Sequence, residues 1–257
     1  MTISRFELKH NLVMKQAILL FTAIFTTPAI GQQPLNSKHN DTHKQVQIGV
    51  NISTDYDFRT LKNNDGSASS GLVIRNRNGI ETGKAGYTAG VNVCVYLGGL
   101  FGLETGVQYS NKGYQTKNQD LVFAQPDPSL PVREKFVYNF HYIGIPVKIN
   151  LRLGEGRIQF IPGAGFSADI FVKATVKNIK EYSSGKREQK TENSTYNYTS
   201  INISPVISLG VNYFLNDKMS IRVEPTYRYG ILKIIEARVT EYLWNAGLNI
   251  GFYFGLK

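Results

Sequence analysis

The sequence predicts an all-β protein, an eight-stranded antiparallel up-and-down barrel that crosses a membrane with its strands. Segments in which apolar and polar side chains alternate recur along the chain, as in strands with two different faces. No apolar run approaches the length of about eighteen residues that a spanning helix needs. Long and short connections alternate between the segments. This alternation is typical of barrels with long external loops and short periplasmic turns.

The composition favours the same fold class. The chain of 257 residues contains 24 Gly, 15 Tyr and 14 Phe with only 19% charged residues, which favours a β-rich protein over a disordered one. A mean hydropathy of -0.22 excludes a helical membrane bundle but is compatible with a barrel that has a polar lumen. The single cysteine, Cys94, excludes an internal disulfide and is expected to be a small buried residue.

The N-terminal segment predicts export. Lys15 precedes an apolar run at residues 17–25, and Ala29-Ile30-Gly31 matches the small-x-small pattern of a signal-peptide cleavage site. The mature chain is therefore expected to begin near Gln32, with Met14 as an alternative start of synthesis. This divides the chain into a signal peptide (1–31), a polar lead-in expected to be disordered (32–44) and an outer-membrane barrel (45–257).

The clearest alternation is in the last segment, from Tyr242 to Lys257. One of its faces carries Tyr242, Trp244, Ala246, Leu248, Ile250, Phe252, Phe254 and Leu256. The other face carries Asn245, Gly247, Asn249, Gly251, Tyr253 and Gly255. A tilted strand of about 9 to 11 residues crosses a bilayer, so this segment is expected to be the closing strand of the barrel. With it, the eight expected strands span 46–58, 85–97, 101–110, 136–151, 158–176, 196–215, 219–231 and 242–257.

Turn and loop residues separate these strands. The long connections, which contain Asn, Gly, Ser, Pro or many charges, are expected at 60–83, 111–134 and 177–195. Short turns are expected at Gly98-Gly99, Gly154-Glu155-Gly156 and Asn216-Asp217, and a medium connection at 232–240. A soluble lipocalin-like barrel also has eight strands, so the strand number does not distinguish it from a membrane barrel.

Side-chain volume favours the membrane barrel. The interior of an eight-stranded barrel is just wide enough for side chains to fill, and the apolar face of these strands is too bulky for it. The apolar face is therefore expected to point outward into lipid. In the fourth strand we place Phe136, Tyr138, Phe140 and Tyr142 on that face, with a bulge at Ile143-Gly144 that shifts the phase of the rest. The prolines that are each expected to need a bulge or lose a ladder bond are Pro146, Pro162, Pro205 and Pro225.

The polar face carries charges of both signs in equal number. The acidic set is Asp55, Asp57, Glu104, Asp169 and Glu224. The basic set is Lys148, Arg152, Lys173, Arg222 and Arg228. Buried charges need partners, so we expect a salt-bridged lumen plug formed chiefly by Glu104, Lys148, Arg152, Asp169, Lys173, Arg222, Glu224 and Arg228. A proton or ion path through the same residues is the alternative.

The first long connection is rich in cations. Around it, Asp65 and Glu81 are outnumbered by Arg59, Lys62, Arg75, Arg77 and Lys84. Together with the net charge of +10, this predicts an anionic partner such as lipopolysaccharide phosphate or a secreted acidic protein. The basic residues of the whole chain are scattered and lack a nucleic-acid-binding motif, so no nucleic acid is expected as a partner.

Three segments of the barrel region form distinctive motifs. They are Tyr142-Ile143-Gly144-Ile145-Pro146-Val147-Lys148, Gly163-Ala164-Gly165-Phe166, and the hairpin from Gly210 to Gly230, which ends in Tyr227-Arg228-Tyr229-Gly230. Through these motifs the chain resembles, from residue 46 to 257, the PorT-like outer-membrane β-barrel proteins, and the first motif looks like the family's Tyr-x-x-Ile-Pro segment. The resemblance implies a signal peptide, an outer-membrane barrel and no assigned activity, while PorT itself is tied to protein secretion and gliding.

The sequence offers no catalytic, metal or cofactor motif. It lacks HExxH, a P-loop and CxxC. The one histidine of the barrel region, His141, has Asn139 and Lys148 as neighbours by strand alternation, which does not favour a Ser-His-Asp site. We therefore expect a non-enzymatic outer-membrane barrel that acts through its external loops as a binding, assembly or secretion-associated component of the envelope. Its expected partners are outer-membrane lipids, lipopolysaccharide and a protein of a secretion or envelope complex. A small channel or an enzyme of the same architecture is the alternative, and a soluble lipocalin-like binding barrel is the third hypothesis.

Overall fold

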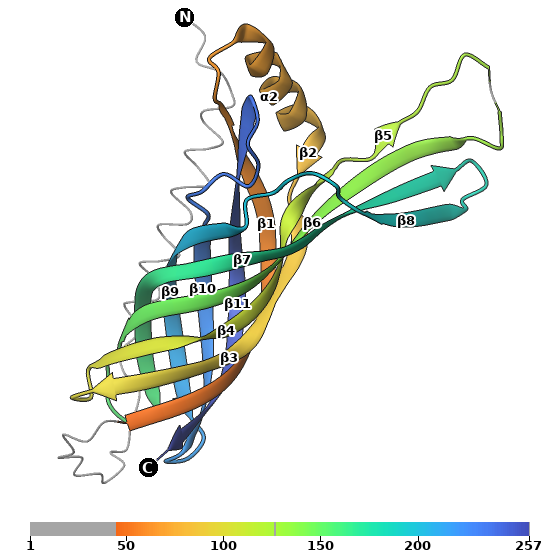
Figure 1. Ribbon diagram of the computed structural model, residues 1–257. Coiled ribbons are helices and arrows are strands. Elements are labelled where there is room, and N and C mark those ends of the chain that lie inside the picture. Colours follow the sequence, from red (N-terminus) through yellow and green to blue (C-terminus); the bar gives the residue numbers. More distant parts are fainter. Residues whose placement is uncertain (1–44, 126, 257) are drawn as a thin grey trace, which may run out of the picture. The chain divides into compact units, whose positions relative to one another are not determined.

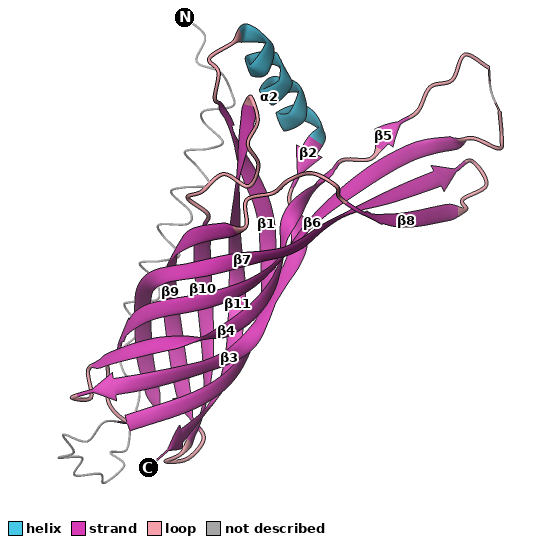
Figure 2. Ribbon diagram, in the orientation of Figure 1, coloured by secondary structure: helices cyan, strands magenta, loops and turns pink. Residues whose placement is uncertain are grey.

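The computed structural model describes residues 45–125 and 127–256, and the predicted signal peptide and the whole predicted lead-in lie outside them. Eight long antiparallel strands form a closed ring in the order β1-β3-β4-β6-β7-β9-β10-β11 (Figures 1 and 2). The ring closes because β1 pairs with β3 on one side and with β11 on the other. The eight-stranded antiparallel barrel predicted from the sequence is confirmed.

Three short strands and one helix are added to the ring. The strands of the ring are β1 (Gln45–Asn63), β3 (Lys84–Leu97), β4 (Phe101–Thr116), β6 (Pro131–Leu151), β7 (Ile158–Tyr182), β9 (Ile201–Phe214), β10 (Met219–Tyr229) and β11 (Val239–Leu256). The further elements are α2 (Ala68–Ile80), β2 (Glu81–Thr82), β5 (Gln119–Asp120) and β8 (Arg187–Asn193). Within the described part of the chain, no helix is long and apolar enough to cross a membrane.

Side chains alternate between the two surfaces of the wall as expected for half-apolar strands. On β1, Val50 and Ile52 are 56% and 58% exposed, whereas Asn51 and Ser53, which alternate with them, are buried in the lumen. The same apolar-out, polar-in pattern continues along β3, β9 and β10. The outward direction of the apolar face, which was inferred from volume, is therefore correct for these strands.

Aromatic side chains gather on the outer wall where the apolar band ends. Trp244 contacts both Tyr56 and Tyr227, with ring centroids 6.0 Å and 6.1 Å apart. Farther along the wall, Tyr109 lies between Tyr87 and His141. We call these residues the aromatic girdle: Tyr56, Tyr87, Tyr109, His141, Tyr227 and Trp244. Such rings are typical of the interface between hydrocarbon and headgroups, so the girdle marks one edge of the membrane-spanning band.

The structure corrects the predicted face of the fourth strand. Phe140 and Tyr142 are buried inside the barrel, and the inward phase continues through Gly144 to Lys148 without a shift. The irregularity lies instead in β7, where Val172 is the extra residue between the partners of His141 and Tyr142. A bulge is thus present near the expected height, but it changes the phase of β7 rather than that of β6.

The inward aromatic residues form an apolar plug above the polar part of the lumen. Its buried members are Tyr114, Phe140, Tyr142, Ala174, Ile234 and Leu243. Phe58, Tyr138, Phe171, Tyr198 and Ile235 pack against them. This plug was not predicted from the sequence, because every large apolar side chain was expected to face lipid.

Two of the four strand prolines interrupt a ladder. Pairing between β4 and β6 is broken at Pro146, and pairing between β9 and β10 is broken at Pro225. The same register resumes beyond each break, so neither proline forms a bulge. The break at Pro225 lies beside a shallow apolar groove on the outer wall. Pro162 and Pro205 keep cross-strand partners in the ladder between β7 and β9.

The short turns have the predicted positions, but the long connections contain more structure than predicted. Gly98 and Gly99 have positive φ angles of 62° and 82°, which a tight turn requires and which glycine adopts most readily. In the region expected as the loop 60–83, β1 continues to Asn63 and α2 begins after the N-cap Ser67, whose side chain accepts a hydrogen bond from the Ser70 amide. The helix has no apolar stripe, so periodicity did not reveal it.

The other two long connections are largely sheet. In the region expected as the loop 177–195, β7 continues to Tyr182 and turns into β8, which pairs with it. On the other side of β7, β6 begins at Pro131 and pairs with β5. We call this extension of the sheet beyond the girdle the arm: β5, residues 131–140 of β6, residues 173–182 of β7, and β8. Figure 1 shows the arm projecting past the end of the barrel.

Because the strands pack closely, replacing a glycine of the barrel wall by alanine is expected to destabilise the protein. At Gly165, an added Cβ would overlap the carbonyl oxygen of Val147 and lie 2.6 Å from the Cα of Lys148. Gly165→Ala is therefore expected to lower the free energy of unfolding by about 1–3 kcal/mol, as overpacking does. Gly71→Ala, at a helical position with nothing within 4 Å, should be neutral or stabilising. Urea titration followed by heat-dependent gel mobility measures both, and equal stability of the two variants would contradict the packing argument.

Candidate functional site

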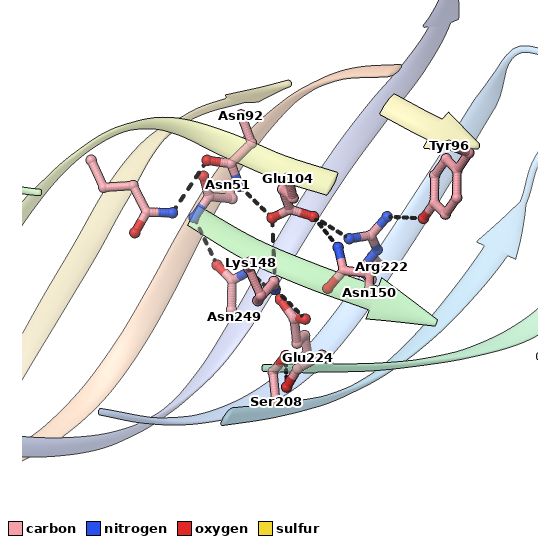
Figure 3. A network of polar contacts seen from close by, with 12 residues as sticks. Asn51, Asn92, Tyr96, Glu104, Lys148, Asn150, Ser208, Arg222, Glu224 and Asn249 are labelled. Carbon is pink, nitrogen blue, oxygen red and sulfur yellow. Dashed lines mark hydrogen bonds and ion pairs between the residues drawn. The ribbon is translucent and has the colours of Figure 1, made fainter. Parts of the chain in front are cut away.

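The lower lumen contains a connected polar network centred on Glu104 of β4 (Figure 3). Arg222 Nη1 of β10 lies 2.7 Å from Glu104 Oε2, and Asn150 Nδ2 donates to the same oxygen at 2.8 Å. The other carboxylate oxygen, Oε1, accepts a hydrogen bond from Asn92 Nδ2 at 3.1 Å and lies 3.6 Å from Lys148 Nζ. Three strands, β3, β6 and β10, thus direct side chains at one carboxylate.

A second carboxylate, Glu224 of β10, completes the network. Lys148 Nζ lies 2.6 Å from Glu224 Oε1, and Asn249 Nδ2 donates to Oε2 at 3.3 Å. Arg222 is held from two further sides, because it donates to the hydroxyl of Tyr96 at 3.1 Å and stacks over the ring of Tyr253 at 4.1 Å. The lysine therefore bridges two carboxylates that lie 120 positions apart in the chain, Glu104 and Glu224.

The network balances its own charge. Glu104 and Glu224 face Lys148 and Arg222, so two negative charges meet two positive charges. All four side chains are buried, with Arg222 and Glu224 each only 1% exposed. A buried ion is tolerated when it is paired and its remaining donors and acceptors are hydrogen-bonded. The arrangement is suited to holding charges in fixed positions and filling the barrel with side chains.

The other predicted lumen residues take different places. Asp169 is buried higher in the barrel, where Lys112 Nζ approaches Oδ2 to 2.6 Å and Ser204 donates to the same atom. Arg228 is buried on β10, and the half-buried Arg152 stacks over the ring of Tyr96 at 3.5 Å. Lys112 was missed because it lies in the stretch predicted to be a loop.

Lys173 does not lie in the lumen. It is exposed on the outer wall, although strict alternation along the fifth predicted strand places it inside. The physical reason is the extra residue Val172, which reverses the alternation of β7 from that point onward. The predicted lumen cluster therefore divides into the central network, the Asp169–Lys112 pair and separate cations.

A third charged group lies in the same barrel near the start of β3. Thr88 Oγ1 donates to Asp55 Oδ2 at 2.6 Å, and Lys84 Nζ lies 3.4 Å from Asp57 Oδ2. Asp55, Asp57 and Lys84 are all buried. Lys84, predicted to belong to an external anion-binding loop, is therefore an internal partner of Asp57.

The rest of the predicted anion-binding loop is also largely neutralised. Arg59 Nη2 lies 2.6 Å from Glu81, and Arg77 reaches both Glu81 at 2.7 Å and Glu241 at 2.6 Å. Burial lowers the pKa of the Arg77 guanidinium, but the hydrogen bond to Glu81 and the charge of Glu241 outweigh it, so that pKa is raised. These contacts fasten α2 to the end of the barrel wall through Tyr114, which donates to Glu241 at 3.0 Å.

Only two cations of that predicted loop are on the surface. Arg75 and Lys62 are exposed, and Lys62 Nζ lies 4.6 Å from the centroid of the Tyr242 ring. Three of the five side chains predicted to bind an anion, Arg59, Arg77 and Lys84, thus form ion pairs within the protein. The charge count is correct, but the structure does not bring the five cations into one surface group, and anion binding by them stays a prediction.

The described residues show little chemistry beyond charge pairing. Among residues 45–125 and 127–256, no group of three or more His, Cys, Asp or Glu side chains could hold a metal ion. His141 faces the outer wall and its Nδ1 lies 2.5 Å from the hydroxyl of Tyr109. Cys94 is a buried free thiol in the barrel wall.

A family model described as "Outer membrane protein beta-barrel domain" matches residues 31–236, most of the chain. The chain belongs to this family. The protein is therefore an outer-membrane β-barrel protein, and the outward apolar band and aromatic girdle are its lipid-facing surface. No curated protein gives a significant match.

Solved structures of outer-membrane barrels resemble this one at low identity. Neisserial surface protein A shares 12% identity, with 80% of this chain and 95% of that chain covered and a TM-score of 0.40. The outer membrane protein OprG from Pseudomonas aeruginosa shares 13%, with 82% and 95% covered and a TM-score of 0.46. The outer membrane protease OmpT from Escherichia coli shares 9%, with 82% and 97% covered and a TM-score of 0.42. At these values the likenesses carry no information on function.

The network predicts a large penalty for removing one partner. Arg222→Leu leaves Glu104 buried without its closest cation, so the free energy of unfolding should fall by about 3–5 kcal/mol. The double variant Arg222→Leu/Glu104→Leu removes both charges and should recover part of that loss. Lys190→Leu, which breaks the exposed pair with Glu192, should cost less than about 1 kcal/mol. Urea titration of the refolded barrel measures all three, and similar values for Arg222→Leu and Lys190→Leu would disprove the structural role of the network.

Proposed function

We propose that the protein is a non-enzymatic outer-membrane component that binds or helps to assemble other envelope molecules through the structure beyond the aromatic girdle. The observation that carries this proposal is the contrast between the two polar regions of the molecule. The charges of the central lumen network are buried and neutralised in pairs. The arm, by contrast, presents a surface on which every residue of β8 is exposed.

The arm has the features of a binding element on a rigid scaffold. It consists of strands that continue from the barrel wall, so its position is set by β6 and β7 rather than by a free loop. Its edge strand β8 pairs with β7 alone among the described strands, which leaves one row of backbone donors and acceptors unpaired. On the nearby helix α2, Leu72 and Val73 are 62% and 47% exposed. Surfaces of this kind commonly carry function in proteins with a rigid core.

The resemblance to PorT-like barrels supports one class of partner. On that basis the partner is a protein of a secretion or envelope complex, and the arm is the surface it contacts. The alternating charges of β8, Arg187, Glu188, Lys190 and Glu192, fit a polar, reversible contact better than a permanent apolar one.

A small channel is the second candidate, because the lumen is lined with polar side chains from end to end of the lower barrel. The same side chains also close it: Arg222, Tyr96 and Tyr253 are among the largest fully buried ones. No comparable observation favours an enzymatic role. His141 lies on the outer wall and shares a hydrogen bond with Tyr109.

Shortening the hairpin of β7 and β8, which forms the edge of the arm, tests the first candidate. Val176 and Glu192 are cross-strand partners, so replacing residues 177–191 by an Asn-Gly turn shortens the hairpin without altering the barrel register. The variant should keep its heat-dependent gel mobility and fail to complement a deletion strain. Gly98→Asn, which converts the turn at the opposite end to Asn-Gly, is the control and should complement fully. Full complementation by the shortened variant would disprove a function for the hairpin of β7 and β8.

Conductance tests the second candidate. Because paired side chains fill the lower lumen, the purified protein in a planar bilayer should show little steady conductance. Glu224→Gln should leave that result unchanged. Stable channels in the wild type, with an ion selectivity that Glu224→Gln alters, would favour the channel and contradict the closed plug.

A further inference from the structure

The outward face of the arm carries three lysines, of which one lies beside the aromatic girdle and the others farther along the arm. We call Lys135, Lys173 and Lys177 the lysine ladder. Lys173 is the cross-strand partner of His141, and Lys177 is the partner of Val137. Lys135 lies two positions from Val137 on β6, diagonally across from Lys177, at a spacing of about 7–8 Å for such neighbours.

The register places all three side chains on the lipid side of the sheet. His141, opposite Lys173, stacks on the girdle residue Tyr109 with ring centroids 5.9 Å apart. Ala174, the next residue along β7, is buried in the apolar plug and so belongs to the inner face. Side chains two apart share a face, so Lys177 follows Lys173 outward. Lys173 is exposed, and the other two are half-buried by their stems.

Acidic residues do not neutralise the ladder. The other cations of the same outward face are paired, Arg133 with Asp120 at 2.9 Å and Arg187 with Glu181 at 3.4 Å. Across the described residues, the three ladder lysines form no ion pair or side-chain hydrogen bond. The positive charge is therefore left available on the side that faces the surrounding membrane.

The opposite face and tip of the same arm are electrically balanced. Lys186 lies 2.7 Å from Glu188, and Lys190 lies 2.6 Å from Glu192. Lys180 shares that inner face with its partner Glu134. The excess of positive charge thus belongs to one face of the sheet and not to the arm as a whole.

The spread of the three lysines along the arm favours one class of phosphate ligand. Lys173 and Lys177 lie four positions apart on β7, which is about 13 Å along a strand that rises about 3.4 Å per residue. The headgroup layer beyond the hydrocarbon is about 5–8 Å thick. A phospholipid places one phosphate at one depth, whereas a glycolipid with several phosphates presents them at several depths.

We propose that the lysine ladder binds the phosphates of lipopolysaccharide next to the barrel. The ammonium groups act as point charges for phosphate oxygens, and the girdle fixes their level relative to the acyl chains. This inference stands apart from the proposed function: it needs neither a protein partner nor the tip of the arm. It replaces the anion site that the sequence placed around Arg59 and Arg77.

The test uses the full refolded chain in detergent and fluorescently labelled lipopolysaccharide as the probe. The triple variant Lys135→Gln/Lys173→Gln/Lys177→Gln should weaken binding at least tenfold. The control Lys180→Gln/Lys186→Gln/Lys190→Gln makes the same change of charge on the other face and tip, and should bind within twofold of the wild type. Binding by the wild type should weaken as salt is raised, because exposed charges are screened.

Two further probes separate the sources of phosphate. Dephosphorylated lipopolysaccharide should bind the wild type as weakly as intact lipopolysaccharide binds the triple variant, and phosphatidylglycerol micelles should compete poorly. Unchanged binding by the triple variant, an equal loss in the control, or equal affinity for the dephosphorylated probe would each overturn the proposal. Equally effective competition by phosphatidylglycerol would overturn the choice of glycolipid. If the triple variant fails to refold, Lys173→Gln alone should still weaken binding about threefold, and no change would count against the ladder.

Discussion

The small cross-section of an eight-stranded barrel is the constraint on which the rest of this structure depends. The lumen admits Tyr253 only because Gly49 and Gly251 lie against its ring, where any Cβ would come within 2.6 Å of it. Tyr96 lies in the same way against Gly102. These two tyrosines then hold Arg222, one by a hydrogen bond and one by stacking, and Arg222 in turn pairs with Glu104. The glycines among the polar residues of the inner face therefore make room in the lumen for a few large side chains.

The contents of the barrel change in character along its axis. The lower lumen holds ion pairs, while the end beyond the girdle holds the aromatic plug and the contacts that attach α2. Both levels join strands far apart in the chain: Glu104 reaches Arg222 across 118 positions, and Tyr114 reaches Glu241 across 127. Such contacts form only when the ring closes, so they stabilise the closed barrel against open intermediates of the sheet.

The sequence predicted the strands and most of their faces because one set of side chains was apolar and the other small or polar. That contrast fails in β6, where Phe140 and Tyr142 point inward while Ile143 and Ile145 point outward. With apolar residues on both faces, period two identifies a strand but not its orientation. The central pairs of the lumen were predicted because charges on an inner face need partners. Lys112 and the contacts of Arg77 could not be predicted, since they depend on how far strands and helix continue past the bilayer.

The bulge at Val172 links the two features that the sequence placed wrongly. Before it, odd positions of β7 such as Asp169 face the lumen, and after it the even position Ala174 does. A β7 without the extra residue would direct Lys173 and Lys177 into the apolar plug, where their charges would have no partner. With it, Ala174 completes the plug and both lysines face the membrane. One inserted residue thus determines both the packing of the plug and the positive charge on the outer wall. Strict alternation could predict neither feature, because it assumes that no residue is inserted.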